Sequence, residues 1–221
     1  MQMLQREHPF ASGPGAARVP AEPDATAGNE RLTALAGASL LVPLAVIGVT
    51  LLRLHGLLSV HLFVGMLLVP PVLLKLGTTV YRFARYYTGN VGYRLRGAPP
   101  LAMRALGPAV VLTTVIVFAS GIALLYTGPS ERSTLVPIHK VSFIAWIVFT
   151  AVHVLAHLLD MFDGVSRDFA RRSAAVVRVP GRELRALAVG FTLVVGVTLA
   201  VLFIPEFSSW TQWNAHQHGD H

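Results

Sequence analysis

Five long apolar runs, separated by polar connections, organise the chain. Each run is long enough to cross a hydrocarbon core of about 30 Å, which takes about 20 helical residues. Unpaired backbone groups are costly in lipid, so the runs predict helices. The sequence therefore predicts an all-α integral membrane protein with five transmembrane helices, at about 32–52, 57–80, 103–126, 135–159 and 184–204.

The composition supports a membrane protein over a soluble one. Only 13% of the residues are charged, whereas soluble domains carry about 25%. The net charge of +7 is explained by arginine in cytoplasmic loops, and no nucleic-acid module is present, so lipid is the expected partner. The chain has no cysteine, which excludes thiolate metal sites and attachment of c-type haem through a C-x-x-C-H motif.

The distribution of arginine predicts the orientation. The connections 82–104 and 160–185 hold five and six arginines, while 53–56 and 127–134 hold one each. The positive-inside rule then places the N-terminus and both arginine-rich loops in the cytoplasm. We expect a disordered cytoplasmic tail over 1–30, a transmembrane domain over 31–205 and an extracytoplasmic tail over 206–221, in a protein of the cell membrane.

Two further features bear on how the helices lie. Pro70 and Pro71 fall in the middle of the second predicted helix, where proline removes a backbone donor and predicts a kink. Trp210 and Trp213 follow the last helix and suit an aromatic belt at the outer membrane interface.

Two histidines lie at matching depth in different predicted helices. His61 and His139 are each about one turn into the second and fourth helices, which run in the same direction. Two axial ligands of one haem require imidazoles at equal height on neighbouring helices, with their rings facing each other. The alternative is that each histidine only forms hydrogen bonds between helices. Because ionisable groups in membrane helices are costly, we interpret this pair as a haem site.

Three other residues fit the same site. Gly65 lies one turn below His61 and removes a side chain where a porphyrin edge needs room. Lys140 and Arg53 lie near the outer end of their helices and could meet haem propionates. The sequence therefore predicts helices two to four as the core of a haem-binding bundle of the four-helix type.

A second spacing supports this interpretation. His139 and His153 are 14 residues apart, which places them within about 40° of one helix face and about 21 Å apart along the axis. In this H-x13-H spacing the chain resembles the helical-bundle b-type cytochromes of respiratory chains. These include the cytochrome b subunits of nickel–iron hydrogenases and formate dehydrogenases and the b subunit of quinol–cytochrome c reductase. The resemblance implies two stacked haems, each completed by a histidine from another helix.

The sequence departs from the two-haem pattern at Lys75, which stands 14 residues after His61. An inner haem on His153 or His157 thus lacks an obvious second imidazole, and one haem b is the expectation. His157 then has three open roles: a partner that orients His153, a proton-relay group near a quinone, or an alternative ligand.

A competing constellation uses the same helix. His153, His157 and Asp160 recur on one face and resemble a zinc or di-iron ligand set, as in metal-dependent membrane hydrolases and hydroxylases. Such a site needs further ligands from another helix, and the sequence supplies none at that depth. A transporter or a non-catalytic membrane anchor is the other alternative.

The C-terminal tail carries three more histidines beside Asp220. They fit a solvated segment, with weak metal binding as the alternative: His216, His218 and His221.

The sequence therefore predicts a membrane b-type cytochrome. Such a protein positions the haem, sets its potential through two imidazoles and insulates it with apolar helices. The predicted partners are an extracytoplasmic oxidoreductase subunit and a quinone, so the chain is expected to be an electron-transfer subunit rather than a separate enzyme.

Overall fold

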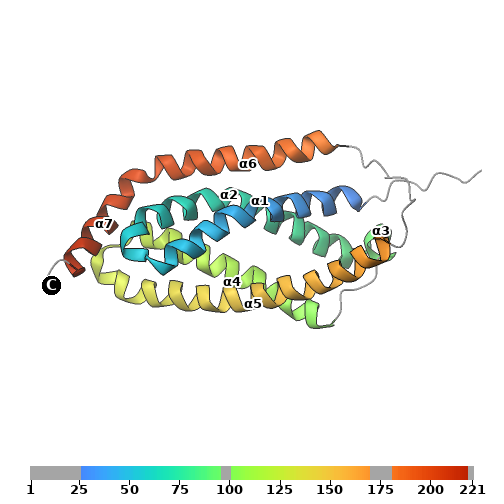
Figure 1. Cartoon of the computed structure of the whole chain (residues 1–221), viewed down its shortest axis with the longest axis horizontal. Coiled ribbons are helices and arrows are strands. Elements are labelled where there is room, and N and C mark those ends of the chain that lie inside the picture. The colour runs from blue at the N-terminus through green and yellow to red at the C-terminus, as the bar shows by residue number, and fades with distance from the viewer. Residues whose placement is uncertain (1–25, 96–100, 170–180, 219–221) are drawn as a thin grey trace, which may run out of the picture.

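The computed structural model describes residues 26–95, 101–169 and 181–218; at 101–102, 129, 156–169 and 212–218 it describes the backbone only. These residues form helices joined by short connections, and no strand occurs among them (Figure 1). The helices are α1 (Ala27–Leu52), α2 (Leu54–Tyr87), α3 (Val91–Leu95), α4 (Leu101–Tyr126), α5 (Pro129–Phe169), α6 (Arg182–Leu202) and α7 (Ile204–His218).

Five of these helices, α1, α2, α4, α5 and α6, are long and apolar enough to cross a membrane. This confirms the predicted all-helical, multi-pass architecture. Each predicted run falls largely within one of them, although α2 and α5 continue well beyond the apolar run into polar sequence. The predicted N-terminal tail lies outside the described residues up to 25, and residues 27–30 already belong to α1.

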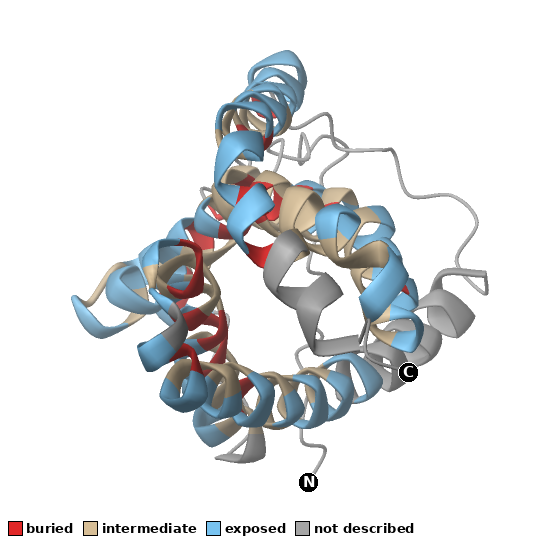
Figure 2. Cartoon of the chain, turned by 90° about the vertical axis from the view of Figure 1, so that its left-hand side faces the viewer, coloured by how far each residue is buried: buried red, intermediate tan, exposed pale blue. Residues whose placement is uncertain are grey.

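The long helices pack in two groups. α2 packs against α1 and α6, and α4 packs against α5, whereas α2 meets α4 over a shorter contact. Among the described residues, no Cα of α5 comes within 8 Å of α1 or α2. Viewed from the α7 end, α1, α2, α4 and α5 surround a central space and α6 lies on the outside (Figure 2). Side chains of both groups line this space, and the site described below lies in it.

The contact between α2 and α6 depends on a glycine. A Cβ added at Gly196 would collide with the backbone carbonyl oxygen of Leu67, so the two helices touch through main-chain atoms here. Around this contact Met66, Leu125, Ala200 and Phe207 form a buried apolar cluster that joins α2, α4, α6 and α7. Small residues allow this close approach of membrane helices.

The backbone of α2 is irregular near its start rather than at the proline pair. Leu57 has non-helical dihedral angles (φ −118°, ψ 17°), whereas Pro70 and Pro71 lie within continuous helix. The predicted kink at the proline pair is therefore not accompanied by non-helical dihedral angles. Proline fixes φ near the helical value, so its ring costs a hydrogen bond without forcing the local dihedral angles out of the helical region.

The C-terminal segment differs from the expected tail. Residues 204–218 form α7, and Phe207 and Trp210 are buried, with 5% and 7% of their surface exposed. Ile204, Phe207 and Trp210 recur every three residues, which puts apolar side chains on one side of the helix. Trp210 therefore points into the protein, and not outward as a residue of an aromatic belt would.

Candidate functional site

A cavity of about 420 Å³ lies between the two groups of helices, toward the end of the bundle that carries α7. Side chains of α1, α2, α4, α5 and α7 line it, and nearly all of them are apolar. The exceptions are His61, His139, Lys140 and the indoles of Trp146 and Trp210. Cavities of roughly 300–1,000 Å³ with an apolar lining and a few polar groups are typical of small-molecule and cofactor sites.

The two indole N–H groups are already engaged with protein. Trp146 Nε1 donates to Thr114 Oγ1 at 2.9 Å, and Trp210 Nε1 donates to the carbonyl oxygen of Leu124 at 2.8 Å. The polar groups that remain for an occupant are therefore the two imidazoles and the amine of Lys140.

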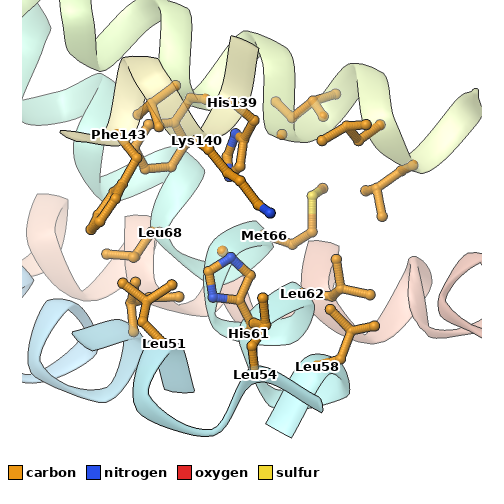
Figure 3. Close-up of a pocket in the computed structure, with 18 of the residues that line it drawn as sticks. Leu51, Leu54, Leu58, His61, Leu62, Met66, Leu68, His139, Lys140 and Phe143 are labelled. Carbon is orange, nitrogen blue, oxygen red and sulfur yellow. The ribbon is translucent and has the colours of Figure 1, made fainter. Parts of the chain in front are cut away.

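Figure 3 shows how these three side chains lie. The His61 ring on α2 and the His139 ring on α5 extend into the cavity from opposite walls and point toward one another, and the Lys140 amine reaches the space beside them. The backbones of α2 and α5 remain apart, so this space is open to an occupant. The structure thus brings together the two histidines that the sequence analysis paired.

A threonine of α1 contacts the ring of His61. Thr50 Oγ1 donates its one proton to the carbonyl oxygen of Ile47 at 2.6 Å, and it lies 3.0 Å from His61 Nδ1. With the hydroxyl proton directed at Ile47, Nδ1 of His61 would be the protonated nitrogen and Nε2 would carry the lone pair.

His139 is held in the same way by a different helix. Ser120 Oγ on α4 donates to the carbonyl oxygen of Val117 at 3.1 Å and lies 3.0 Å from His139 Nδ1. His139 also has a backbone hydrogen bond with Val117, so its ring is held by two groups of α4. A metal-ligating histidine commonly donates its other ring N–H to a fixed acceptor, which orients the ring.

Two glycines shape the space around these rings. A Cβ added at Gly121 on α4 would lie 3.1 Å from Cε1 of His139, so this glycine leaves room for the imidazole. Gly65 lines the cavity, and a Cβ added there would meet no atom within 4 Å. The absence of a side chain at Gly65 thus adds to the open volume, as the sequence analysis expected.

Two of the other predicted site residues lie elsewhere. Lys75 Nζ donates to the carbonyl oxygen of Thr33 on α1 at 2.9 Å, with Gly37 providing the room for it. Arg53 is exposed between α1 and α2. Neither residue lines the cavity, so of the predicted cations only Lys140 reaches it. A lysine turned toward α1 gains a backbone acceptor, which compensates for its position within a membrane helix.

The predicted inner site is not assembled by the described residues. His153 is half-buried on α5 and does not line the cavity. The side chains of His157 and Asp160 lie outside the described part of the chain, as do those of His216, His218, Asp220 and His221. Within the described part, no three histidine or acidic side chains are grouped so that they could hold a metal.

Four residues of the site were not predicted from the sequence: Thr50, Ser120, Gly121 and Trp210. The hydroxyl partners lie 11 and 19 residues before the histidines that they hold, on helices with no histidine of their own. The adjacent pair Ser120 and Gly121 in an apolar run was the available signal, since small and hydroxyl-bearing residues mark helix contacts in membranes.

Comparison with known proteins assigns this arrangement to no family. No protein-family model matches the chain, and no curated protein or solved structure is significantly similar to it. The geometry defines the class of site: a cavity within a multi-pass helical bundle, with two oriented imidazoles on opposite walls.

Proposed function

We propose that the chain is a membrane b-type cytochrome that holds one haem b between His61 and His139 and transfers electrons. The observation that carries this proposal is the pair of imidazoles that line one apolar cavity from opposite walls, each with Nδ1 3.0 Å from a hydroxyl oxygen. Both hydroxyl contacts also join neighbouring helices, so the feature that favours ligation over helix packing is that the two rings line one apolar cavity from opposite walls.

The other lining residues fit the proposed cofactor. The apolar side chains suit a porphyrin face, and Gly65 leaves room for a porphyrin edge. The Lys140 amine would meet a propionate, because it lines the cavity beside the two imidazoles and could form a charge-assisted hydrogen bond with a carboxylate. When bound, haem would supply one-electron redox chemistry.

The two histidines favour electron transfer over substrate chemistry. His61 and His139 would both be occupied in holding the haem, which suits an electron carrier better than a site that binds a substrate. Thr50 and Ser120 would hold the rings in one orientation, and the apolar wall would exclude water. Fixed ligand side chains of this kind would suit one-electron transfer.

One haem is proposed rather than two. Lys75 contacts α1 and His153 does not line the cavity, so no second facing pair in the described part of the chain supports an inner haem. Arginine counting puts the α7 end outside the cytoplasm. On that orientation the redox partner is an extracytoplasmic oxidoreductase subunit, and a quinone is the proposed small carrier in the membrane.

An optical spectrum of the purified, dithionite-reduced protein tests the proposal. We expect a b-type α-band and, by pyridine haemochrome, close to one haem per chain. His61→Ala and His139→Ala should each lose most of the haem, because one imidazole does not hold low-spin iron. His55→Ala is the matched control, since His55 is on α2, is exposed and does not line the cavity.

Two results would refute the cytochrome proposal. One is wild-type protein that binds no haem when haem is supplied during expression. The other is a complete low-spin b-type spectrum in both alanine variants. Stoichiometric zinc or non-haem iron that is lost in His153→Ala would instead favour the metal-dependent hydrolase or hydroxylase.

A further inference from the structure

We infer that Arg132 and Trp210 form a latch that closes the cavity on the α7 side, so that its occupant enters and leaves by displacement of α7. The identity of the occupant as haem rests on the proposed function, whereas the closure can be measured without haem. The latch is defined as these two residues with their contacts to Ser209 and Leu124.

Trp210 is both a wall of the cavity and an anchor of α7. Its indole lines the cavity, only 7% of its surface is exposed, and Nε1 donates to the carbonyl oxygen of Leu124 near the end of α4. Trp210 therefore contacts the cavity and also fixes α7 to α4. Moving α7 away would remove this wall.

Arg132 holds the other face of the same indole. The guanidinium carbon lies 4.0 Å from the centroid of the Trp210 ring, and the guanidinium donates to the carbonyl oxygen and to the hydroxyl of Ser209 at 3.5 and 3.3 Å. Only 5% of Arg132 is exposed. A desolvated cation over an indole is a strong form of the cation–π interaction. This contact joins α5 to α7.

The position of α7 makes these contacts decisive for closure. α7 packs on α2 in one group of helices and on α4 in the other, so it bridges the gap that contains the cavity. It follows α6 after a break at Phe203, where a change in direction separates the two helices (Figure 1). A short helix that packs against the ends of the long helices can open without unfolding of those helices.

The absence of cysteine allows a direct measurement of closure. Val136→Cys places one thiol on the cavity wall, one turn along α5 from Arg132, and Ser133→Cys places one on the exposed side. We expect a water-soluble maleimide to label the thiol at position 136 far more slowly than the thiol at position 133 in otherwise unchanged protein. Adding Arg132→Gln or Trp210→Ala should accelerate labelling at position 136 roughly tenfold, the factor that corresponds to losing about 1.4 kcal/mol of closure. Labelling at position 133 should stay unchanged.

Release of haem provides the second measurement. With apomyoglobin as acceptor, Arg132→Gln and the milder Trp210→Phe, which keeps an aromatic ring but loses the bond to Leu124, should each raise the rate of haem loss about tenfold. A tenfold change corresponds to about 1.4 kcal/mol. The low-spin spectrum should persist in Arg132→Gln, because Arg132 does not line the cavity and is not a proposed ligand.

The outcomes separate the latch from the cytochrome proposal. The latch would be overturned if positions 136 and 133 were labelled at equal rates in otherwise unchanged protein. It would also be overturned if neither latch substitution changed the labelling rate at position 136. Unaltered haem loss in Arg132→Gln and Trp210→Phe would also overturn it, while leaving a low-spin haem on His61 and His139 intact. Protein that binds no haem, but whose thiol at position 136 is protected from the maleimide, would support the closure and refute the cytochrome.

Discussion

The hydroxyl partners of the two histidines provide the sharpest test of the proposed ligation. Thr50→Val and Ser120→Ala each remove one acceptor, 3.0 Å from the Nδ1 of His61 and His139 respectively. Both substitutions keep the side chain close to its original size, and neither residue is a proposed ligand. Any loss of haem affinity would therefore come through the orientation and basicity of the imidazoles.

The expected magnitude follows from the bond that is lost. A neutral hydrogen bond contributes about 1 kcal/mol, and removing the partner that orients a metal ligand typically costs about 10–100-fold in metal affinity. We expect each single variant to bind haem about tenfold more weakly. The double variant should lose about a hundredfold, because the two bonds lie on different helices and act on different rings.

Haem titration of the apoprotein gives the affinity, and electron paramagnetic resonance of the oxidised protein reports the orientation of the two imidazoles. Thr113→Val is the matched control. Thr113 is a buried threonine of α4 that donates only to carbonyl oxygens of its own helix in the described structure, at 2.8 Å for Ala109. It should bind haem like the wild type.

Unchanged affinity and an unchanged resonance spectrum in the Thr50→Val, Ser120→Ala double variant would refute this reasoning. That result would mean that the hydroxyl contacts are helix packing and do not govern the rings. A comparable loss in Thr113→Val would also count against it, because a general weakening of the bundle would then explain both.

Three further predictions follow from particular contacts. Gly65→Leu should abolish haem binding in titrations without lowering the unfolding temperature, because the added side chain would fill cavity space and a Cβ there meets no atom within 4 Å. Lys140→Met should weaken binding of haem several-fold but leave binding of haem dimethyl ester unchanged, since the ester has no carboxylate for the amine. Gly196→Val should destabilise the protein by about 1–3 kcal/mol in thermal unfolding, because its Cβ would collide with Leu67, whereas Gly190→Ala, with open space around it, should not.

The membrane architecture could be predicted because it depends on one dominant physical term. A helix of about 20 apolar residues satisfies its own backbone in lipid, so the runs identify the helices without knowledge of their packing. The pairing of His61 with His139 followed from depth alone, and the structure places both rings at one cavity. Gly65 was selected by its place one turn from His61, and Lys140 by its place near the outer end of its helix.

The remaining features depend on how the helices rotate and pack, and sequence spacing does not determine this. Thr50 and Ser120 reach the histidines from other helices. Lys75 was considered for an inner site, but the rotation of α2 turns it toward Thr33. Trp210 suited the membrane interface by its place after the last apolar run, yet the break after α6 turns α7 back over the bundle. These outcomes required three-dimensional contacts.

The position of the cavity restricts how the proposed cytochrome could move electrons. From His61 to Tyr87 at the far end of α2 there are 26 residues, or about 39 Å of helix. No second pair of facing histidines lines that stretch in the described part of the chain, since Lys75 contacts α1 there. A haem held by His61 and His139 would therefore exchange electrons at the α7 end or with a carrier in the adjacent lipid.

A protein partner at that end would meet α7, the same helix that closes the cavity. Docking and cofactor retention would then be coupled through Arg132 and Trp210, and a partner that binds α7 should slow haem loss in the wild type but have less effect in Arg132→Gln.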